Sequence, residues 1–340
     1  MNDAANDNAP DDPLAHEMRL RCADAPLRIG SRTSPMAMAQ AEHVKALIEK
    51  RVPGLDVRIA GMDTSADLWQ GDLSELGGKG NFTKEIDRAL VSGRIDLAVH
   101  CLKDVPGDVP LPAGTRFAAH LERTDVHDVV VFPAASPHST LAGLPPGSVV
   151  GTSSVRRRAA LSKYRPDLRV EPFRGNVNSR LARLDAGDGP AALILARPGL
   201  ARIGMTDRRH QVLPIDHAPG RNLAMVPAVG AGVISLQARS ADAPVLRLLG
   251  EFDHEQTSTC VTAERAMLSS LRGHCNSPIA GHAVVTPDGL IHLHGMVFNG
   301  DGSEFVYGDA SHTDPALLGG LVATELLRQG GGELITATRK

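Results

Sequence analysis

The chain has 340 residues, 36 Lys and Arg against 39 Asp and Glu, a net charge of −3 and 3% aromatic side chains. This length allows two or three domains, and a weakly acidic chain with few stacking side chains excludes an ordinary nucleic-acid-binding protein. No apolar run is long enough to cross a membrane, and the four widely spaced cysteines form no C-x-x-C pair, so a reducing cytoplasm without structural disulfides is expected.

The N-terminal segment is rich in Asn, Asp, Ala and Pro, and it has no basic stretch followed by an apolar one. This composition predicts a disordered tail over residues 1–17 rather than a secretory signal.

Strands and helices alternate from Leu27 to about Val109, which predicts a parallel or mixed sheet with helices on both faces. Strands are expected at 27–30, 56–60 and 95–100. Helices are expected at 36–50, from its apolar spacing, and from Thr83 to Val91.

A second α/β unit follows, with strands expected at 129–132, 148–150, 168–171 and 191–196. A Pro- and Gly-containing stretch, 225–232, then leads into a strand at 233–236 that could return to the first unit. Chains that cross twice between lobes are common among two-lobed proteins that bind ligands between the lobes.

The character of the chain changes after about Glu251. A helix at 260–271, strands at 283–285, 290–297 and 304–307 separated by turn sequences, and a helix at 315–328 predict a small α+β domain with an antiparallel sheet.

Two basic turns lie where a strand leads into a helix, namely Gly151–Arg158 and Phe173–Arg180. Backbone N–H groups at a helix start carry partial positive charge, so hydroxyls and arginines beside them form an anion site. Arg32 and Ser34 follow the first strand in a third such turn. The cations predict a small ligand that is rich in carboxylates or phosphates. Because none of the turns has the glycine spacing of a nucleotide site, this ligand is not expected to be an ordinary nucleotide.

Other residues admit two interpretations from the pattern alone. Lys103 and Asp104 follow a strand, where they are either a solvated charge pair or a catalytic carboxylate facing the arginines. The glycine-rich stretch 77–80, with Lys79, is either a linker or a lid. Cys275 lies in a loop, and a lone cysteine is more often a small apolar group than a reactive one. The histidines form no metal-binding pattern.

The motifs together resemble the hydroxymethylbilane synthase family, also called porphobilinogen deaminases, over nearly all of 27–334. The landmarks are the segments 27–35, 77–80, 100–106, 151–157, 174–177, 227–230 and 262–266, in this order before Cys275. One such motif would be weak evidence, but the ordered set is specific.

The resemblance implies a transferase with an α/β fold of two lobes like periplasmic binding proteins, with mixed sheets, and a small C-terminal α+β domain. The domains would be 18–120 with 226–248, 124–222, and 250–340. A dipyrromethane cofactor would be attached through a thioether at Cys275 and would prime the addition of four porphobilinogen units. Each unit loses ammonia to give an electrophilic azafulvene, and hydrolysis releases linear hydroxymethylbilane for haem biosynthesis. A cytoplasmic monomer with no nucleic-acid or membrane partner is implied.

The resemblance also assigns roles to residues. Asp104 matches the catalytic aspartate. The cofactor carboxylates would be bound by Lys103, Thr152, Ser153, Ser154, Arg156 and Arg157. The substrate and the growing chain would be bound by Arg32, Ser34, Arg174, Arg180 and Arg202, and Lys79 and Phe82 match the lid.

The sequence departs from the family pattern at four positions. Ala231 replaces a usual glutamine and Cys101 a usual serine, Thr64-Ser65-Ala66-Asp67 replaces a T-x-G-D sequence, and Arg197-Pro198 alters a turn of small residues before Gly199. Two rival functions remain: a non-catalytic binding protein for a small dianion, and a phosphate-utilising transferase, against which the missing nucleotide motif argues.

Overall fold

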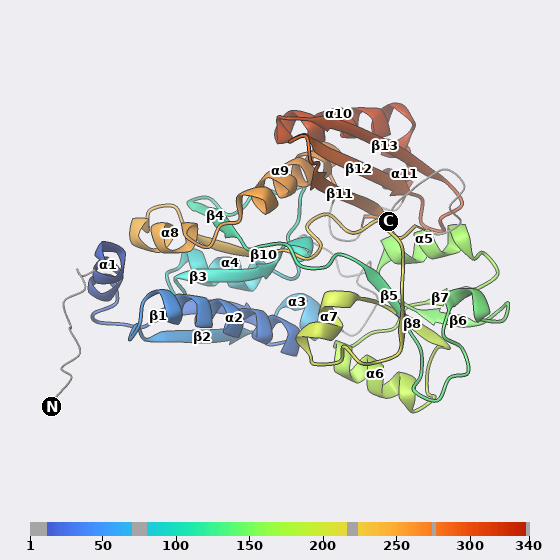
Figure 1. Cartoon of the computed structure of the whole chain (residues 1–340), viewed down its shortest axis with the longest axis horizontal. Helices are drawn as coiled ribbons and strands as arrows, with labels where there is room; N and C mark the ends of the chain where they lie inside the picture. Colours follow the sequence, from blue (N-terminus) through green and yellow to red (C-terminus); the bar gives the residue numbers. More distant parts are fainter. Residues whose placement is uncertain (1–11, 70–79, 216–223, 274–276, 338–340) are drawn as a thin grey trace.

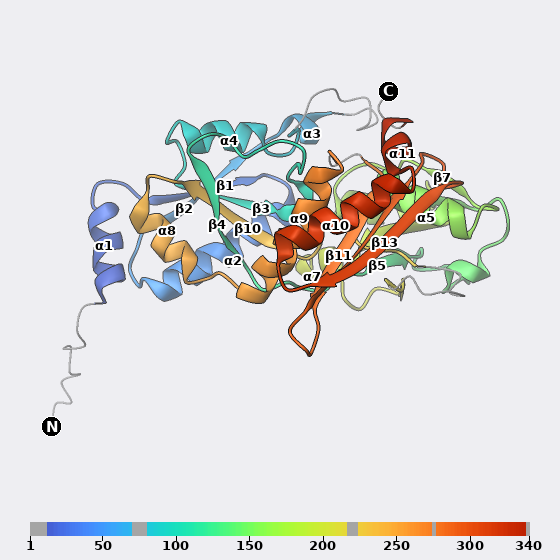
Figure 2. The same cartoon turned by 90° about the horizontal axis from the view of Figure 1, so that it is seen from above.

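A computed structural model describes residues 12–69, 80–215, 224–273 and 277–337. Their strands form two five-stranded sheets and one three-stranded sheet. Each large sheet belongs to one α/β lobe, and the small sheet lies over both lobes with its helices (Figures 1 and 2). The predicted fold class, two α/β lobes with mixed sheets and a small antiparallel C-terminal domain, is confirmed.

The first lobe is built on the sheet β2-β1-β3-β10-β4. Its strands are β1 (Leu27–Arg32), β2 (Val57–Met62), β3 (Leu97–Cys101), β4 (Thr115–His120) and β10 (Ile234–Arg239). Strands β1, β2 and β3 are parallel, whereas β10 runs antiparallel between β3 and β4. The strand after the second lobe therefore returns to the first lobe, as predicted.

Alternate side chains of β3 belong to different cores, because successive strand residues point to opposite faces. Leu97 and Val99 pack in the core with α2 (Pro35–Arg51) and α8 (Ala243–Gly250). Ala98 packs in the core with α4 (Lys84–Val91). Helices thus cover both faces of the sheet, and the carboxyl ends of β1 and β3 remain open toward the second lobe (Figure 1).

The second lobe repeats this plan with the sheet β7-β6-β8-β5-β9. Its elements are β5 (Asp128–Val131), β6 (Val149–Gly151), α5 (Val155–Tyr164), β7 (Arg169–Glu171), α6 (Val177–Asp185), β8 (Ala192–Ala196), α7 (Arg197–Arg202) and β9 (His210–Val212). Strand β6 is parallel to β7 and β8, and β5 is antiparallel to β8. Helices α5 and α6 therefore both begin at the carboxyl ends of parallel strands.

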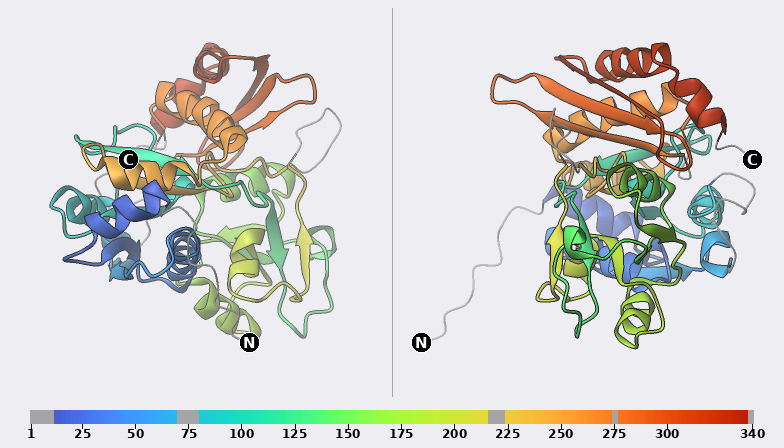
Figure 3. Two further views of the ribbon diagram at one scale, coloured as in Figure 1. Left: turned by 60° about the vertical axis from the view of Figure 1, so that its left-hand side comes forward. Right: turned by 90° about the vertical axis from the view of Figure 1, so that its right-hand side faces the viewer.

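The C-terminal domain pairs β11 (Ile279–Val285), β12 (Ile291–Phe298) and β13 (Phe305–His312) in an antiparallel sheet. Helices α9 (Glu255–Ser270) and α10 (Pro315–Arg328) pack on it with α11 (Gly331–Ala337). Ala280, Met296 and Phe298 of its sheet share a core with the second lobe, and Figure 3 shows the domain seated above that lobe.

The C-terminal domain also holds both segments that cross between the lobes. The buried carboxylate of Glu264, on α9, accepts hydrogen bonds from Arg123 Nη1 at 2.7 Å and from the backbone N–H of Gly230 at 2.8 Å. It accepts a third from the N–H of Ala283 in β11, at 2.8 Å. One side chain thus joins the two crossings to the third domain.

The prediction of a tail over residues 1–17 is wrong for residues 13–17, because a helix, α1 (Pro13–Arg21), begins there. Asp12 caps this helix, and Ala15 and Met18 are buried in the first-lobe core. The low overall hydrophobicity of the segment hid these two apolar side chains. The strands β4 and β9 and the short helices α3 (Ser65–Leu68), α7, α8 and α11 were also not predicted.

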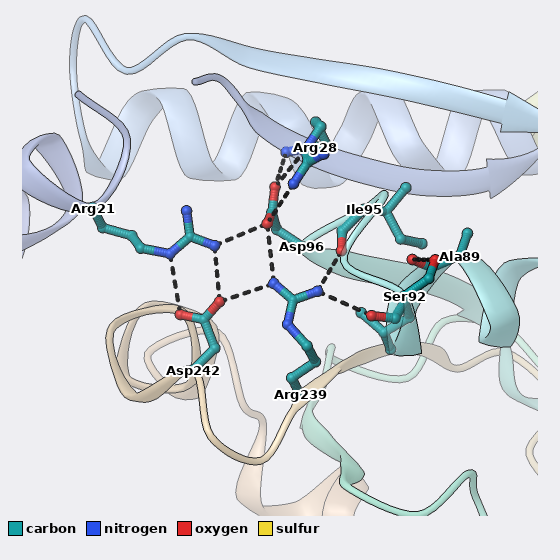
Figure 4. A network of polar contacts seen from close by, with 9 residues as sticks. Arg21, Arg28, Ala89, Ser92, Ile95, Asp96, Arg239 and Asp242 are labelled. Atoms are coloured by element: carbon teal, nitrogen blue, oxygen red, sulfur yellow. Dashed lines mark hydrogen bonds and ion pairs between the residues drawn. The ribbon is translucent and has the colours of Figure 1, made fainter. Parts of the chain in front are cut away.

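Arg21, at the end of α1, joins a network of charges in the first lobe (Figure 4). The buried carboxylate of Asp96 accepts hydrogen bonds from Arg21 at 2.8 Å, from Arg28 at 2.9–3.2 Å and from Arg239 at 3.1 Å. Asp242 bridges Arg21 and Arg239. Helix α1 is therefore tied to β1, to the start of β3 and to the end of β10.

Candidate functional site

A cavity of about 550 Å³ lies between the two lobes, where the carboxyl ends of strands from both sheets face each other. From the first lobe it is lined by Arg32, the last residue of β1, and by Ser34, which caps α2. From the second lobe it is lined by Ser153, Arg174 and Arg180. All three basic turns predicted from the sequence, two from the second lobe and one from the first, thus meet in one cleft.

The second-lobe arginines of this cavity lack counter-ions among the described residues. Nε and Nη2 of Arg174 and Nε of Arg180 are buried without a hydrogen-bond partner. Burial, together with the charges of Arg157 and Arg174, lowers the pKa of Arg180 to about 10. Buried cations without partners are unfavourable, so this arrangement calls for an anion.

The backbone of the turn before α6 explains how Arg174 is presented. Gly175 has a φ of +114°, and a Cβ there would lie 2.5 Å from the Ser179 hydroxyl. Only glycine fits this conformation and this close approach. Asn176 then caps α6 by accepting the N–H of Ser179 at 2.9 Å.

The turn before α5 is ordered by its own hydroxyls. Ser154 caps α5 and accepts the N–H of Arg157 at 3.4 Å. Thr152 is buried and accepts the N–H of Ser154 at 3.3 Å, and the Ser153 hydroxyl donates to the carbonyl of Phe173 at 3.0 Å. The hydroxyls therefore shape the helix start, and of the three residues only Ser153 lines the 550 Å³ cavity.

Arg156 and Arg157 share one buried carboxylate. Asp128, on β5, accepts from Arg156 Nη2 at 2.6 Å and from Arg157 Nη2 at 2.6 Å and Nε at 3.0 Å. Burial opposes ionisation, but the two guanidinium groups hold the pKa of Asp128 well below its usual range. Two cations and one anion leave a net positive charge at the start of α5.

Lys103 and Asp104 lie in a single 3-10 turn directly after β3. The Asp104 carboxylate is 30% exposed, and Arg32 Nη1 lies 3.5 Å from it. Both residues line a small cavity of about 50 Å³ with Arg32, Ser34 and Phe82. This cavity joins the predicted catalytic aspartate to the first-lobe arginine.

A narrower space of about 20 Å³ connects this region to the second lobe and is lined by Lys103, Arg156 and Arg202. Arg202 ends α7 and donates to the Thr124 hydroxyl at 3.4 Å. Ala231 and Pro198, two of the departures from the family pattern, line the same space. The missing side chain at Ala231 therefore falls within the site.

Three residues of the site were not singled out from the sequence. They are Asp67, which pairs with Arg32, Asp128, and Gln40, a buried side chain whose Nε2 has no described partner and which lines the 50 Å³ cavity. A polar residue on the inner face of the predicted helix 36–50 was the available signal for Gln40. Lys79 and Cys275 lie outside the described residues, so their predicted roles stay predictions.

Fold and site together define a two-lobed α/β protein with a third domain, whose cleft presents unpaired arginines beside an aspartate. The family model described as porphobilinogen deaminase, dipyromethane cofactor binding domain, matches residues 27–247, and that of the porphobilinogen deaminase C-terminal domain matches 258–328. The chain belongs to the porphobilinogen deaminase family, an enzyme family whose larger domain binds a dipyrromethane cofactor.

Porphobilinogen deaminases from several bacteria match the sequence over nearly the whole chain. Porphobilinogen deaminase 2 of Streptomyces coelicolor is 49% identical over 311 residues, which cover 91% of this chain and 96% of that protein. The porphobilinogen deaminase of Acidithiobacillus ferrooxidans is 43% identical and that of Paraburkholderia phytofirmans 41%, each over 92% of this chain and over 98% and 89% of their own.

Solved structures resemble this chain only distantly. The Bordetella pertussis BvgS VFT2 domain has a TM-score of 0.40 at 13% identity, covering 71% of this chain and 91% of that one. An ancestral cationic amino acid solute binding protein has a TM-score of 0.41 at 14% identity, covering 70% and 91%.

The described residues fit a cofactor rich in carboxylates. The unpaired N–H groups of Arg174 and Arg180 can donate hydrogen bonds to such carboxylates, and the excess positive charge of Arg156 and Arg157 lies at the start of α5. A cavity of about 550 Å³ is within the range of small-molecule sites. In the part of the chain that the structure describes, no helix has the length and apolar character of a membrane span.

Proposed function

We propose that this chain is a hydroxymethylbilane synthase, which joins four porphobilinogen molecules head to tail with loss of ammonia and then releases the linear product by hydrolysis. The observation that carries the proposal is the pair of arginines with buried, unpaired nitrogens, Arg174 and Arg180, in a cavity that shares Arg32 with the small cavity beside Asp104. Family membership supports the same reaction.

The arginines of the cleft bind the carboxylates of the substrate and of the growing chain. Each porphobilinogen carries an acetate and a propionate, so a chain of several units brings many negative charges into the cleft. Arg174, Arg180 and Arg202 come from the second lobe, and Arg32 with Ser34 comes from the first. Guanidinium forks bind carboxylates in a fixed geometry and so orient the rings between the lobes.

Asp104 is the catalytic group. Loss of ammonia from the aminomethyl carbon leaves a cationic pyrrole, and a carboxylate beside the ring accepts its N–H and stabilises its charge. The same carboxylate can move protons at the reacting carbons. Its partial exposure, at the end of β3, lets it contact a ligand in the cleft.

The dipyrromethane cofactor, when bound, supplies the free α-carbon on which the chain grows. We assign its attachment to Cys275, by a thioether. Its carboxylates would be held by Lys103, Thr152, Ser153, Ser154, Arg156 and Arg157. Because Asp128 fixes both arginines, their remaining N–H groups have a set direction before any ligand binds.

Further parts of the proposal concern the whole chain. Each of the predicted domains, 18–120 with 226–248, 124–222, and 250–340, contains one of the three sheets, and α1 extends the first of them to residue 13. We assign Lys79 and Phe82 to a lid, and of these Phe82 lies beside Arg32, whose guanidinium is 4.6 Å from the Phe82 ring centre. The protein acts in the cytoplasm as a monomer.

The test is turnover of porphobilinogen by the Asp104→Asn variant. The amide keeps the shape of the carboxylate but not its charge, so kcat is expected to fall by about two to four powers of ten. Asp56→Asn is the matched control, since Asp56 is an exposed carboxylate of the same lobe that pairs with the exposed Arg58. Near-normal turnover by Asp104→Asn would remove the catalytic assignment.

A further inference from the structure

One edge of the Arg32 guanidinium contacts Asp67, an aspartate to which the family resemblance assigned no role. Nε of Arg32 donates to Asp67 Oδ2 at 3.0 Å, and Nη2 donates to Asp67 Oδ1. The Phe82 ring lies 4.6 Å from the centre of the guanidinium. The bidentate contact and the ring together restrict rotation of the group.

Asp67 is itself fixed by the start of α3. Its Oδ2 accepts the Thr64 hydroxyl at 2.7 Å and the Thr64 N–H at 3.2 Å, which completes a capping box. Burial opposes its ionisation, but the bonds from Arg32 and Thr64 outweigh this and keep the pKa of Asp67 below its usual range. A charged, immobile carboxylate therefore faces Arg32.

The other edge of Arg32 faces Asp104, and this contact is weak. One nitrogen, Nη1, lies 3.5 Å from Asp104 Oδ2, whereas the Asp67 contacts use two nitrogens at shorter range. Arg32 and Asp104 are both largely shielded from solvent, with side chains 20% and 30% exposed. A guanidinium released from Asp67 could turn its fork onto Asp104 and form the stronger pair there.

We propose that Asp67 is a positioning residue which keeps Arg32 from closing on Asp104, so that the aspartate stays available to the substrate. This rests on the proposed function, because it takes Asp104 as the catalytic group. Asp67 also neutralises Arg32, whose side chain borders both the 550 Å³ and the 50 Å³ cavities and so remains available to a substrate carboxylate. Arg32 therefore binds a substrate carboxylate instead of pairing with the catalytic carboxylate of Asp104.

The kinetic test uses Asp67→Asn, which removes the charge and preserves the size of the side chain. We expect kcat to fall by about 10- to 100-fold, the scale of a misplaced catalytic contact, with a smaller change in KM. Adding Arg32→Gln removes the group that closes on Asp104. The double variant R32Q/D67N should therefore have a higher kcat than D67N alone, although its KM rises because a substrate-binding arginine is gone.

This partial recovery distinguishes positioning from a structural role, since a second damaging substitution would otherwise lower kcat further. Asp56→Asn is the control for loss of a carboxylate from the same lobe, since Asp56 is exposed and pairs with the exposed Arg58. A wild-type kcat in D67N, or a kcat of the double variant no higher than that of D67N, would overturn the proposal.

A crystal structure of the D67N holoenzyme gives a readout that does not depend on activity. We expect Arg32 to make a two-nitrogen contact with Asp104, and an Arg32 that stays in place would overturn the proposal. Failure of the proposed function looks different, because Asp104→Asn would then turn over normally whatever Arg32 does in D67N.

Discussion

The arginines of the cleft differ in what neutralises them, and this separates them into two groups. Arg156 and Arg157 share Asp128 within the second lobe. Arg174 and Arg180 have buried nitrogens without described partners, and burial, together with the charges of Arg157 and Arg174, lowers the pKa of Arg180. Arg156 and Arg157 have a counter-ion within the protein, whereas Arg174 and Arg180 require a bound anion. We therefore expect substitutions in the two groups to fail at different stages.

The prediction compares Arg157→Leu with Arg174→Leu. Arg157→Leu should reduce the fraction of protein that carries the cofactor, because a positive charge is lost at the start of α5. Arg174→Leu should leave cofactor occupancy high but stall the addition of further pyrroles. Denaturing mass spectra, before and after porphobilinogen is added, measure both.

Arg183→Leu is the matched control, since Arg183 lies on the same helix as Arg180, is exposed and stacks on Phe173. Equal cofactor occupancy and equal series of pyrrole adducts in the Arg157 and Arg174 variants would contradict this division of roles.

The cations of the site could be predicted from the sequence, but their counter-ions could not. Arginines that follow strands were visible because each strand-to-helix turn is local. Asp128 meets Arg156 only because β5 lies beside β8 in the sheet, and Asp67 meets Arg32 only because β2 lies beside β1. Such pairs depend on strand order, which no local pattern specifies.

At the scale of elements, the predicted bounds were correct where the sequence of the segment contains its own capping residues. Helix α10 spans Pro315–Arg328 as predicted, with Pro at its first position and Asp314 as its cap. Strand β10 was placed correctly in the first lobe, although it extends to Arg239. Helix α1 was missed because its burial depends on contacts with the first-lobe core, including α8, far along the chain.

The network around Asp96 predicts a large loss of stability in Asp96→Asn. The carboxylate is buried and accepts bonds from three arginines, so its loss leaves three partly buried guanidinium groups with only Asp242 to neutralise them. The expected loss is about 3–5 kcal/mol in the free energy of unfolding, measured with urea.

Asp56→Asn should change that free energy little, because Asp56 is exposed and pairs with the exposed Arg58. Since the Asp96 network lies outside the cleft residues, the folded Asp96→Asn protein should keep its kcat. A loss of stability no larger than that of Asp56→Asn would contradict the account of this network.

At the scale of the whole molecule, the third domain is joined to the rest through buried polar groups. Glu264 bonds both crossing segments, and His282 of β11 is buried near it. Burial lowers the pKa of His282 to about 4, and it does the same for His120 of β4. Both histidines are therefore neutral in the folded protein at neutral pH.

This gives stability a predicted dependence on pH. The unfolded chain binds protons at these histidines near the ordinary pKa of about 6.5, before the folded protein does, so stability is full above that pH and falls as pH drops toward 4. Each histidine contributes at most about 1.4 kcal/mol per pH unit in this window.

Urea unfolding at several pH values measures the slope. His282→Gln should reduce it, whereas His43→Gln, at an exposed position of α2, should not. An unchanged slope in His282→Gln would show that this histidine is not held neutral by the fold.

The most direct test of the central claim is the intact mass of the purified protein, followed by peptide mapping. A hydroxymethylbilane synthase should carry the mass of two linked pyrrole units, resistant to thiol reductants because a thioether is not a disulfide. The adduct should map to the peptide with Cys275, and Cys275→Ser should remain unmodified and make no tetrapyrrole. An unmodified wild-type chain that turns over porphobilinogen, or an adduct on Cys101, whose thiol pKa is raised by burial, would contradict the account.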